Sequence, residues 1–429
     1  MLRAGYSIFY PQIFYRDFFG STAGFANTTT TYSPPNNNTN LAAFQFKDGL
    51  PYAATEPLGS KLGPGFLLSQ GVNWDQGNEK VPMSQQWTVS LQRQLPWQVL
   101  VDAAYSANHG TGLIANGYDY NQLDPQYQSL GLSLQNQVAN PYKGLVPGAL
   151  GGNTISRSQL LKPFPYYTSI NVRNPHLGSS IYHSFLLSVE KRLSNGFAIL
   201  GSYTFAKLIS DSANVPINFG SVEVGSAQGY QNGLYDRRAE RSVDPSDVSN
   251  RLVVSGIYEL PFGKGKRFAP SNAVTEKLVG GWQVNVISTM QGGLPLVVRG
   301  ANNFLANRPN STGVSAKLDN PTAERWFDTI QFLNPPNFTF GNVGRALPDV
   351  RSPGVVNFDL SLIKDTMITE KFRAQLRAEA FNFVNHTNLG SPNTSFSPGA
   401  DGRNRSATFG TITSSRDPRI VQFGLRLIF

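Results

Sequence analysis

The sequence has no cysteine and few charged residues, which make up only 15% of its 429 positions. The lack of cysteine excludes disulfide bridges and thiolate metal sites. The charged fraction lies well below the roughly 25% of ordinary soluble domains. No run approaches the ~20 apolar residues of a membrane helix, which excludes a helical inner-membrane protein. The mean hydropathy of −0.25 still permits membrane strands, because alternating strands average to a neutral hydropathy.

Aromatic and turn-forming residues are abundant instead, with 28 Phe, 17 Tyr, 41 Gly and 28 Pro. This combination predicts an all-β fold with long polar loops. The net charge of +9 comes from Lys and Arg residues that are scattered along the chain. A nucleic-acid interface needs a clustered basic patch, so we expect no nucleic-acid partner. The first residues, Met1 to Tyr6, lack the charged and apolar regions of a signal peptide.

Polar and apolar residues alternate in segments of about ten residues, the signature of a half-exposed strand. The last segment, Val421 to Phe429, is the clearest, because every odd position in it is apolar and the even positions include Gln422 and Arg426. Similar alternation occurs at residues 2–10, 86–92, 99–105, 184–190, 197–205, 252–260, 282–286, 356–364 and 372–379. The sequence therefore predicts about ten antiparallel strands.

The connections between these segments alternate between short and long. The short ones are Leu95–Trp97, Ser194–Gly196 and Asp365–Glu370, and Pro261–Gly280 is of medium length. The long ones are residues 11–82, 108–180, 208–247, 294–354 and 384–418. A soluble sandwich has no reason to sort its loops in this way. Short periplasmic turns and long extracellular loops are typical of a transmembrane outer-membrane β-barrel, and an even strand number returns Phe429 to the periplasmic side.

In such a barrel the apolar side chains would face lipid and the polar ones would face the lumen. The lumen-facing candidates, which could line a ligand path, contact a plug or form structural salt bridges, are Gln92, Asp359, Arg373, Arg377, Glu379 and Arg426. Aromatic residues near strand ends could form interfacial girdles or serve ordinary packing. These interface candidates are Trp87, Trp97, Phe197, Tyr203 and Trp282.

The sequence carries no enzyme signature. Its four histidines lack metal-ligand spacing, and Gly263–Lys266 lacks the Ser/Thr and the upstream Gly of a phosphate loop. The loop carboxylates Asp236, Glu240, Asp244 and Asp247 are interleaved with Arg237, Arg238, Arg241 and Arg251. We expect these charges to pair with one another, and a Ca²⁺ site is the alternative. The sequence predicts no catalytic residue, no metal site and no cofactor.

Several motifs resemble the Oar-like TonB-dependent transporters of the outer membrane. The motifs are Tyr182–Phe197, Tyr203–Lys207, Asp247–Leu252, Tyr258–Phe268, Leu376–Asn388 and the terminal strand. The resemblance implies a barrel of about 22 strands with a plug domain and import powered by the TonB complex. Residues 1–429 would then be the C-terminal portion of that barrel, about half of it, with the plug and N-terminal domains outside this chain.

The resemblance also implies partners for the chain: outer-membrane lipid, the barrel-assembly machinery and an unidentified, large ligand. The assembly machinery would recognise the terminal aromatic strand through Val421, Phe423, Leu425, Leu427 and Phe429. Two other functions remain open. One is a passive porin-like channel, and the other is a secreted or surface β-sandwich adhesin that binds glycans through loop tyrosines such as Tyr118 and Tyr166.

Overall fold

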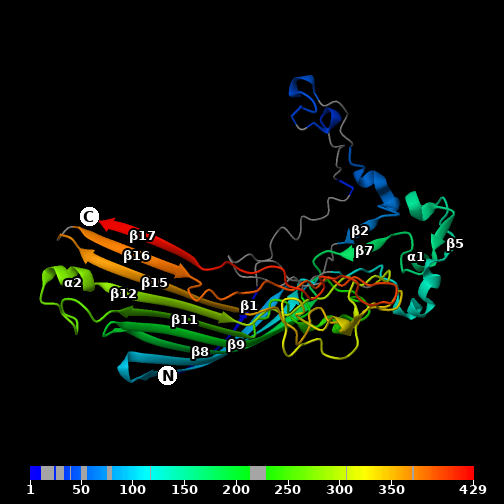
Figure 1. Ribbon diagram of the computed structural model, residues 1–429. Helices are drawn as coiled ribbons and strands as arrows, with labels where there is room; N and C mark the ends of the chain where they lie inside the picture. The colour runs from blue at the N-terminus through cyan, green and yellow to red at the C-terminus, as the bar shows by residue number, and fades with distance from the viewer. Residues whose placement is uncertain are drawn as a thin grey trace. The chain divides into compact units, whose positions relative to one another are not determined.

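The ten alternating segments pair into one open antiparallel sheet in chain order (Figure 1). The computed structural model describes residues 1–10, 24–25, 33–38, 40–49, 56–74, 80–115, 117–212, 229–305, 307–369 and 372–429. The sheet strands are β1 (Leu2–Phe9), β3 (Met83–Leu95), β4 (Val99–Leu113), β8 (Gly178–Ser194), β9 (Phe197–Ser210), β11 (Asn250–Glu259), β12 (Trp282–Gln291), β15 (Val355–Met367), β16 (Arg373–Phe381) and β17 (Ile420–Ile428). The predicted ten-strand antiparallel fold is confirmed.

The register keeps the two kinds of side chain on separate faces. Val286 lies opposite Leu360, which lies opposite Ala380, and Ala380 lies opposite Val421. The next row along the strands joins Asn285, Ser361, Glu379 and Gln422. A slip of one residue between any two strands would mix these rows, so the alternation itself fixes the register. In these strands one face is thus mainly apolar and the other mainly polar, with Ile287 and Ile363 among the polar side chains.

Short turns lie at one end of the sheet and long connections at the other (Figure 1). The predicted loop 108–180 was too long, because β4 runs to Leu113, β8 begins at Gly178, and the two strands pair Gly110 with Ser180 and Thr111 with Ser179. These small polar residues lack the apolar alternation that marks a strand. The predicted turn at Asp365 also began too early, since β15 runs to Met367.

The connections contain short helices and strands. The 3₁₀ turn η5 (Pro96–Gln98) joins β3 to β4, and α2 (Ala273–Val279) lies between β11 and β12. The long connections carry β10 (Ser242–Val243), which pairs with the end of β9, together with η8 (Arg237–Glu240), β13 (Asn310–Ser311), η9 (Thr329–Gln331) and β14 (Phe332–Leu333). Among the described residues, no helix is long and apolar enough to cross a membrane.

The chain divides into two units. The first contains the sheet and three long connections at one of its ends, residues 229–249, 292–354 and 382–419, which we call the loop assembly. The second is built from residues 12–79 and 117–174. Its elements are η2 (Pro35–Asn37), η3 (Phe46–Asp48), η4 (Gly59–Gly65), β2 (Gly71–Trp74), η6 (Pro125–Gln135), β5 (Gln137–Ala139), η7 (Gly148–Gly151), β6 (Thr154–Ser156), α1 (Arg157–Leu160) and β7 (Ser169–Val172).

The loop assembly has a hydrophobic core of its own. Phe327, Phe332 and Phe409 are buried, and their rings meet edge to face at centroid distances of 5.1–5.8 Å. Val298 and Phe396 belong to the same cluster. The core joins residues from two long connections, so these loops are a folded layer and not independent surface excursions.

Candidate functional site

The six predicted lumen residues share one face of the sheet. Arg377 lies opposite Ile363, Glu379 opposite Ser361 and Arg426 opposite Gln375. Their partners are other side chains of this face. Arg373 forms an ion pair with Asp365 at 2.7 Å, Arg377 Nε donates to Gln375 at 2.6 Å, Gln422 donates to Glu379, and Asn357 donates to Asp359 at 2.9 Å. At the far edge of the sheet, Gln92 accepts a hydrogen bond from Arg3 at 3.3 Å.

The terminal strand β17 is an edge strand whose apolar side chains are exposed to solvent. Phe423 is 82% exposed and Phe429 is 97% exposed. Val421, Leu425 and Leu427 also remain about half exposed or more, on the same face as Phe423. This edge pairs with no other strand in the described part of the chain, and an apolar row on such an edge is costly in water and stabilised by lipid or by another strand.

Four of the five predicted interface aromatics lie on the apolar face. Trp87 meets His183 in an edge contact, and Phe197 meets Tyr258 in the same way at 6.4 Å. Tyr203 and Trp282 lie on the same face, Tyr203 opposite Leu252 and Trp282 opposite Lys364. Trp97 instead lies in the turn η5 with a positive φ of 60°, and it is 85% exposed.

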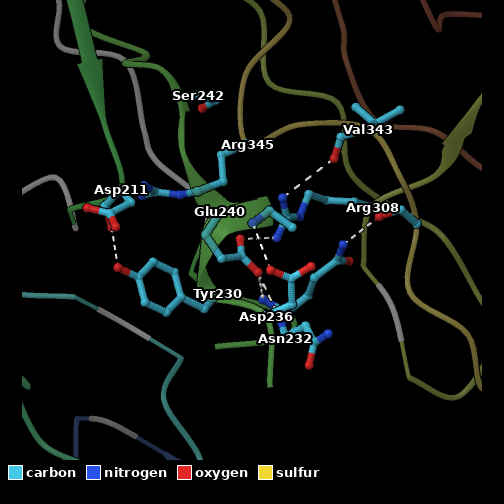
Figure 2. Close-up of polar contacts among 12 residues, drawn as sticks. Asp211, Tyr230, Asn232, Asp236, Glu240, Ser242, Arg308, Val343 and Arg345 are labelled. Carbon is cyan, nitrogen blue, oxygen red and sulfur yellow. Dashed lines mark hydrogen bonds and ion pairs between the residues drawn. The ribbon is translucent and has the colours of Figure 1, made fainter. Parts of the chain in front are cut away.

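The loop assembly buries an ion pair between Glu240 and Arg308 (Figure 2). Both side chains are at most 2% exposed. The second oxygen of Glu240 accepts from the backbone N–H groups of Gln231 and Asn232 at 2.9 and 3.0 Å. A buried carboxylate without hydration is stable only when a cation and hydrogen-bond donors contact it. The ion pair therefore links the loop of Glu240 to the loop of Arg308.

A second buried cation lies beside this pair. Arg345 is 1% exposed, donates to the carbonyl oxygen of Ser212 at 2.6 Å and lies over the ring of Tyr230 at 5.7 Å. Its burial lowers its pKa. Tyr230 donates its hydroxyl to the carbonyl oxygen of Asp211. Burial, and then the nearby Asp211 carboxylate, raise the pKa of Tyr230 well above its ordinary range.

The predicted pairing of loop carboxylates with arginines of their own loop was wrong for Glu240 and Asp247. Glu240 pairs with Arg308, and Asp247 pairs with Arg351. Asp244 accepts hydrogen bonds from Ser210 and Ser246, and Asp236 caps η8 through the N–H of Ala239. Arginines on the short η8 are exposed to water, whereas a buried carboxylate needs a partner from a neighbouring segment. The described residues contain no group of three or more His, Cys, Asp or Glu placed to hold a metal ion.

A recess of about 540 Å³ opens in the loop assembly. Apolar side chains, including Val243, Phe332 and Leu347, form part of its wall. Polar groups at its edge include Arg241, Asn342 and Asp349, the last of which accepts a hydrogen bond from Ser315. A concave surface with apolar walls and a few polar groups can bind a ligand.

In the second unit the tyrosines considered for glycan stacking pack against one another. The rings of Tyr118 and Tyr120 meet at 5.4 Å, and Trp74 lies 5.2 Å from Tyr120. Tyr166 and Tyr167 are likewise 5.2 Å apart. The four tyrosines are half-buried, so packing inside the unit accounts for their positions.

Comparison with known proteins decides the family. A family model for an outer membrane beta barrel domain matches residues 1–422. The chain belongs to this outer membrane β-barrel family. It is therefore a protein of the outer membrane, and the open antiparallel sheet is its barrel-forming part. A search of curated protein sequences found no match.

Several solved structures of outer-membrane receptors and transporters show a detectable likeness to this outer membrane β-barrel chain. They include the ferric-catecholate import receptor Fiu of Escherichia coli K12 (11% identity, TM-score 0.34, 86% of this chain and 31% of that one). The E. coli outer membrane transporter YddB gives 10% identity, a TM-score of 0.39 and coverages of 84% and 34%. The ferripyoverdine receptor of Pseudomonas aeruginosa is 11% identical, with a TM-score of 0.31; the match covers 81% of this chain and 27% of the receptor. The chain spans about a third of the length of these proteins.

Arg308, Arg345 and Tyr230 were missed in the sequence. No spacing marks them, because Arg308 and its partner Glu240 are 68 positions apart and lie in different loops. The scarcity of charged residues in these loops was the one available signal, because an arginine in a charge-poor loop indicates that its charge is paired.

Proposed function

We propose that this chain is part of the barrel of an Oar-like TonB-dependent transporter that imports a large ligand. Its polar face, with Arg373, Arg377, Glu379 and Arg426, would line the lumen and contact a plug domain. The loop assembly would meet the ligand outside the cell. The plug and the contact with the TonB complex would lie in a part of the protein outside this chain.

One observation supports this function above the others. The polar face carries hydrogen-bonded charged and amide side chains on β15, β16 and β17, in a sheet with two open edges, β1 and β17, among the described residues. In lipid an open edge leaves backbone groups unsatisfied, so both edges need partner strands, which in the proposed transporter further strands would supply. A barrel larger than ten strands leaves a lumen wide enough for a plug.

The proposal is tested by the size and energy dependence of the protein in its own outer membrane. Antibodies against the loop assembly should detect a polypeptide much larger than 46.9 kDa, whose reading frame encodes a plug and about twelve more strands upstream. Vesicles containing that protein should not leak small sugars. A polypeptide of 46.9 kDa that makes vesicles permeable to sugars would contradict the proposal and favour a passive porin.

The glycan-binding adhesin is the weaker alternative, because its candidate tyrosines pack against each other. The barrel-assembly machinery remains an expected partner of the terminal strand. The apolar row from Val421 to Phe429 supports this expectation, since an exposed edge strand can be extended by a strand of another protein.

A further inference from the structure

The connection between β11 and β12, residues 260–281, exposes apolar and basic side chains together at the short-turn end of the sheet. Val274 and Leu278 lie one turn apart on α2, and each is 66% exposed. Phe268 is 51% exposed, and the guanidinium of Arg267 lies over its ring at 5.5 Å. Exposed apolar side chains are unfavourable in water. At a membrane–water interface the apolar side chains contact acyl chains and the basic ones contact headgroups, so the combination is stabilised.

Two contacts tie the end of α2 to the apolar face of the sheet. The indole N–H of Trp282 donates to the carbonyl oxygen of Leu278 at 2.9 Å. Lys364 lies opposite Trp282 in the register, stacks over its ring at 5.4 Å and donates to the carbonyl oxygen of Gly280. The face that borders the lipid therefore continues into this connection.

A glycine allows this close approach. Gly281 has a φ of +69°, and a Cβ atom at this position would lie 2.2 Å from the carbonyl oxygen of Asp365. The connection is thus held against β15 at a fixed place, and Val274 and Leu278 are presented by a defined structure.

The charges at this end of the sheet leave an excess of cations in the same connection. Most of the neighbouring carboxylates are neutralised locally, because Glu190 pairs with Arg192, Glu259 with Lys266 and Asp365 with Arg373. Among the described residues, the cations of the connection that form no ion pair are Lys264, Arg267 and Lys277. All three are exposed.

We propose that residues 260–281 bind anionic phospholipid in the membrane leaflet at the short-turn end of the sheet. Val274, Leu278 and Phe268 enter the acyl-chain boundary, and Lys264, Arg267 and Lys277 contact lipid phosphates. Basic residues beside an anionic surface and apolar rings at the headgroup level both stabilise this arrangement. The proposal rests on the outer-membrane location and not on transport.

The test uses the whole chain, which has no cysteine, so that a fluorophore on Leu278→Cys labels one position. The labelled protein is reconstituted in phosphatidylethanolamine vesicles that contain spin-labelled phosphatidylglycerol or, at the same mole fraction, spin-labelled phosphatidylethanolamine. We expect quenching by both lipids and stronger quenching by phosphatidylglycerol. Charge reversal in K264E/R267E/K277E should remove this preference, with a loss of relative affinity of at least roughly fivefold for each reversed cation.

A matched control reverses three exposed cations in the loop assembly, R299E/K317E/R403E, and should keep the preference for phosphatidylglycerol. Circular dichroism must show equal β content in all variants before they are compared. A label that neither lipid quenches would overturn the proposal, because the connection would then lie in water. Equal quenching by the two lipids in the otherwise native chain would also overturn it, since anionic selectivity would be absent.

Discussion

At the scale of single residues, the structure depends most on charges that are buried in pairs. Glu240 and Arg308 hold together two loops that are distant in sequence, and both have lost contact with water. Removing one partner of such a pair leaves the other as an uncompensated buried charge, which is far more costly than losing a surface pair.

Glu240→Ala should therefore lower the local stability of the loop assembly by about 3–5 kcal/mol. Hydrogen exchange of amides in residues 292–354 measures this as a lower free energy of opening. The double variant Glu240→Met/Arg308→Leu should be milder, because no charge is left buried. Asp401→Ala breaks the exposed pair with Arg405 and should cost no more than ~1 kcal/mol. Equal effects of Glu240→Ala and Asp401→Ala would show that the Glu240 pair is not buried.

Tyr230 should keep its proton in strongly alkaline solution. Its pKa is raised above the ordinary 10.0 by burial and by Asp211, so the unfolded chain loses this proton at lower pH than the folded one. The stabilisation is complete below about pH 10 and is lost as the pH rises beyond that value. The contribution of Tyr230 is obtained by subtracting the absorbance titration curve of the Tyr230→Phe variant from that of the native protein. This difference curve should show no tyrosinate step near pH 10. A step there would mean that Tyr230 is accessible to water.

At the scale of elements, each strand is defined by its own alternation, which is why the strands could be predicted from the sequence. Val421 to Phe429 specifies its two faces without reference to the rest of the chain. The loop core could not be predicted in this way. Phe327 and Phe409 meet across about eighty positions with no period between them, and Arg308 shows no sign in its own segment of a partner in another loop.

The terminal strand offers a test of which face borders lipid. Phe423→Arg places a cation near the middle of β17 on the apolar face, and Gln422→Arg places one next to it on the polar face. A cation on the lipid side near the bilayer centre costs about 2–4 kcal/mol, so the first variant should lower the free energy of unfolding from lipid vesicles by that amount. The second should change it by less than ~1 kcal/mol. Similar losses in both variants would contradict the assignment of the faces.

At the scale of the whole molecule, three properties act together. Strands β12, β15, β16 and β17 pair in a register that gives them a mainly apolar and a mainly polar face, the long connections leave the sheet at one end, and the family is that of outer membrane β-barrels. A soluble sandwich would bury its apolar face against a second sheet. In the present sheet that face still exposes Phe185, Phe205, Phe423 and Leu425.

The most direct test of the membrane account is a spin-label scan along β15, one cysteine at a time in the cysteine-free chain, with the protein in lipid vesicles. The account predicts that labels at residues 356, 358, 360 and 362 meet oxygen dissolved in the lipid, and that labels at 357, 359 and 361 meet a water-soluble nickel reagent. If the even positions are shielded from oxygen, or if they meet the nickel reagent, the apolar face does not border lipid and the account is wrong.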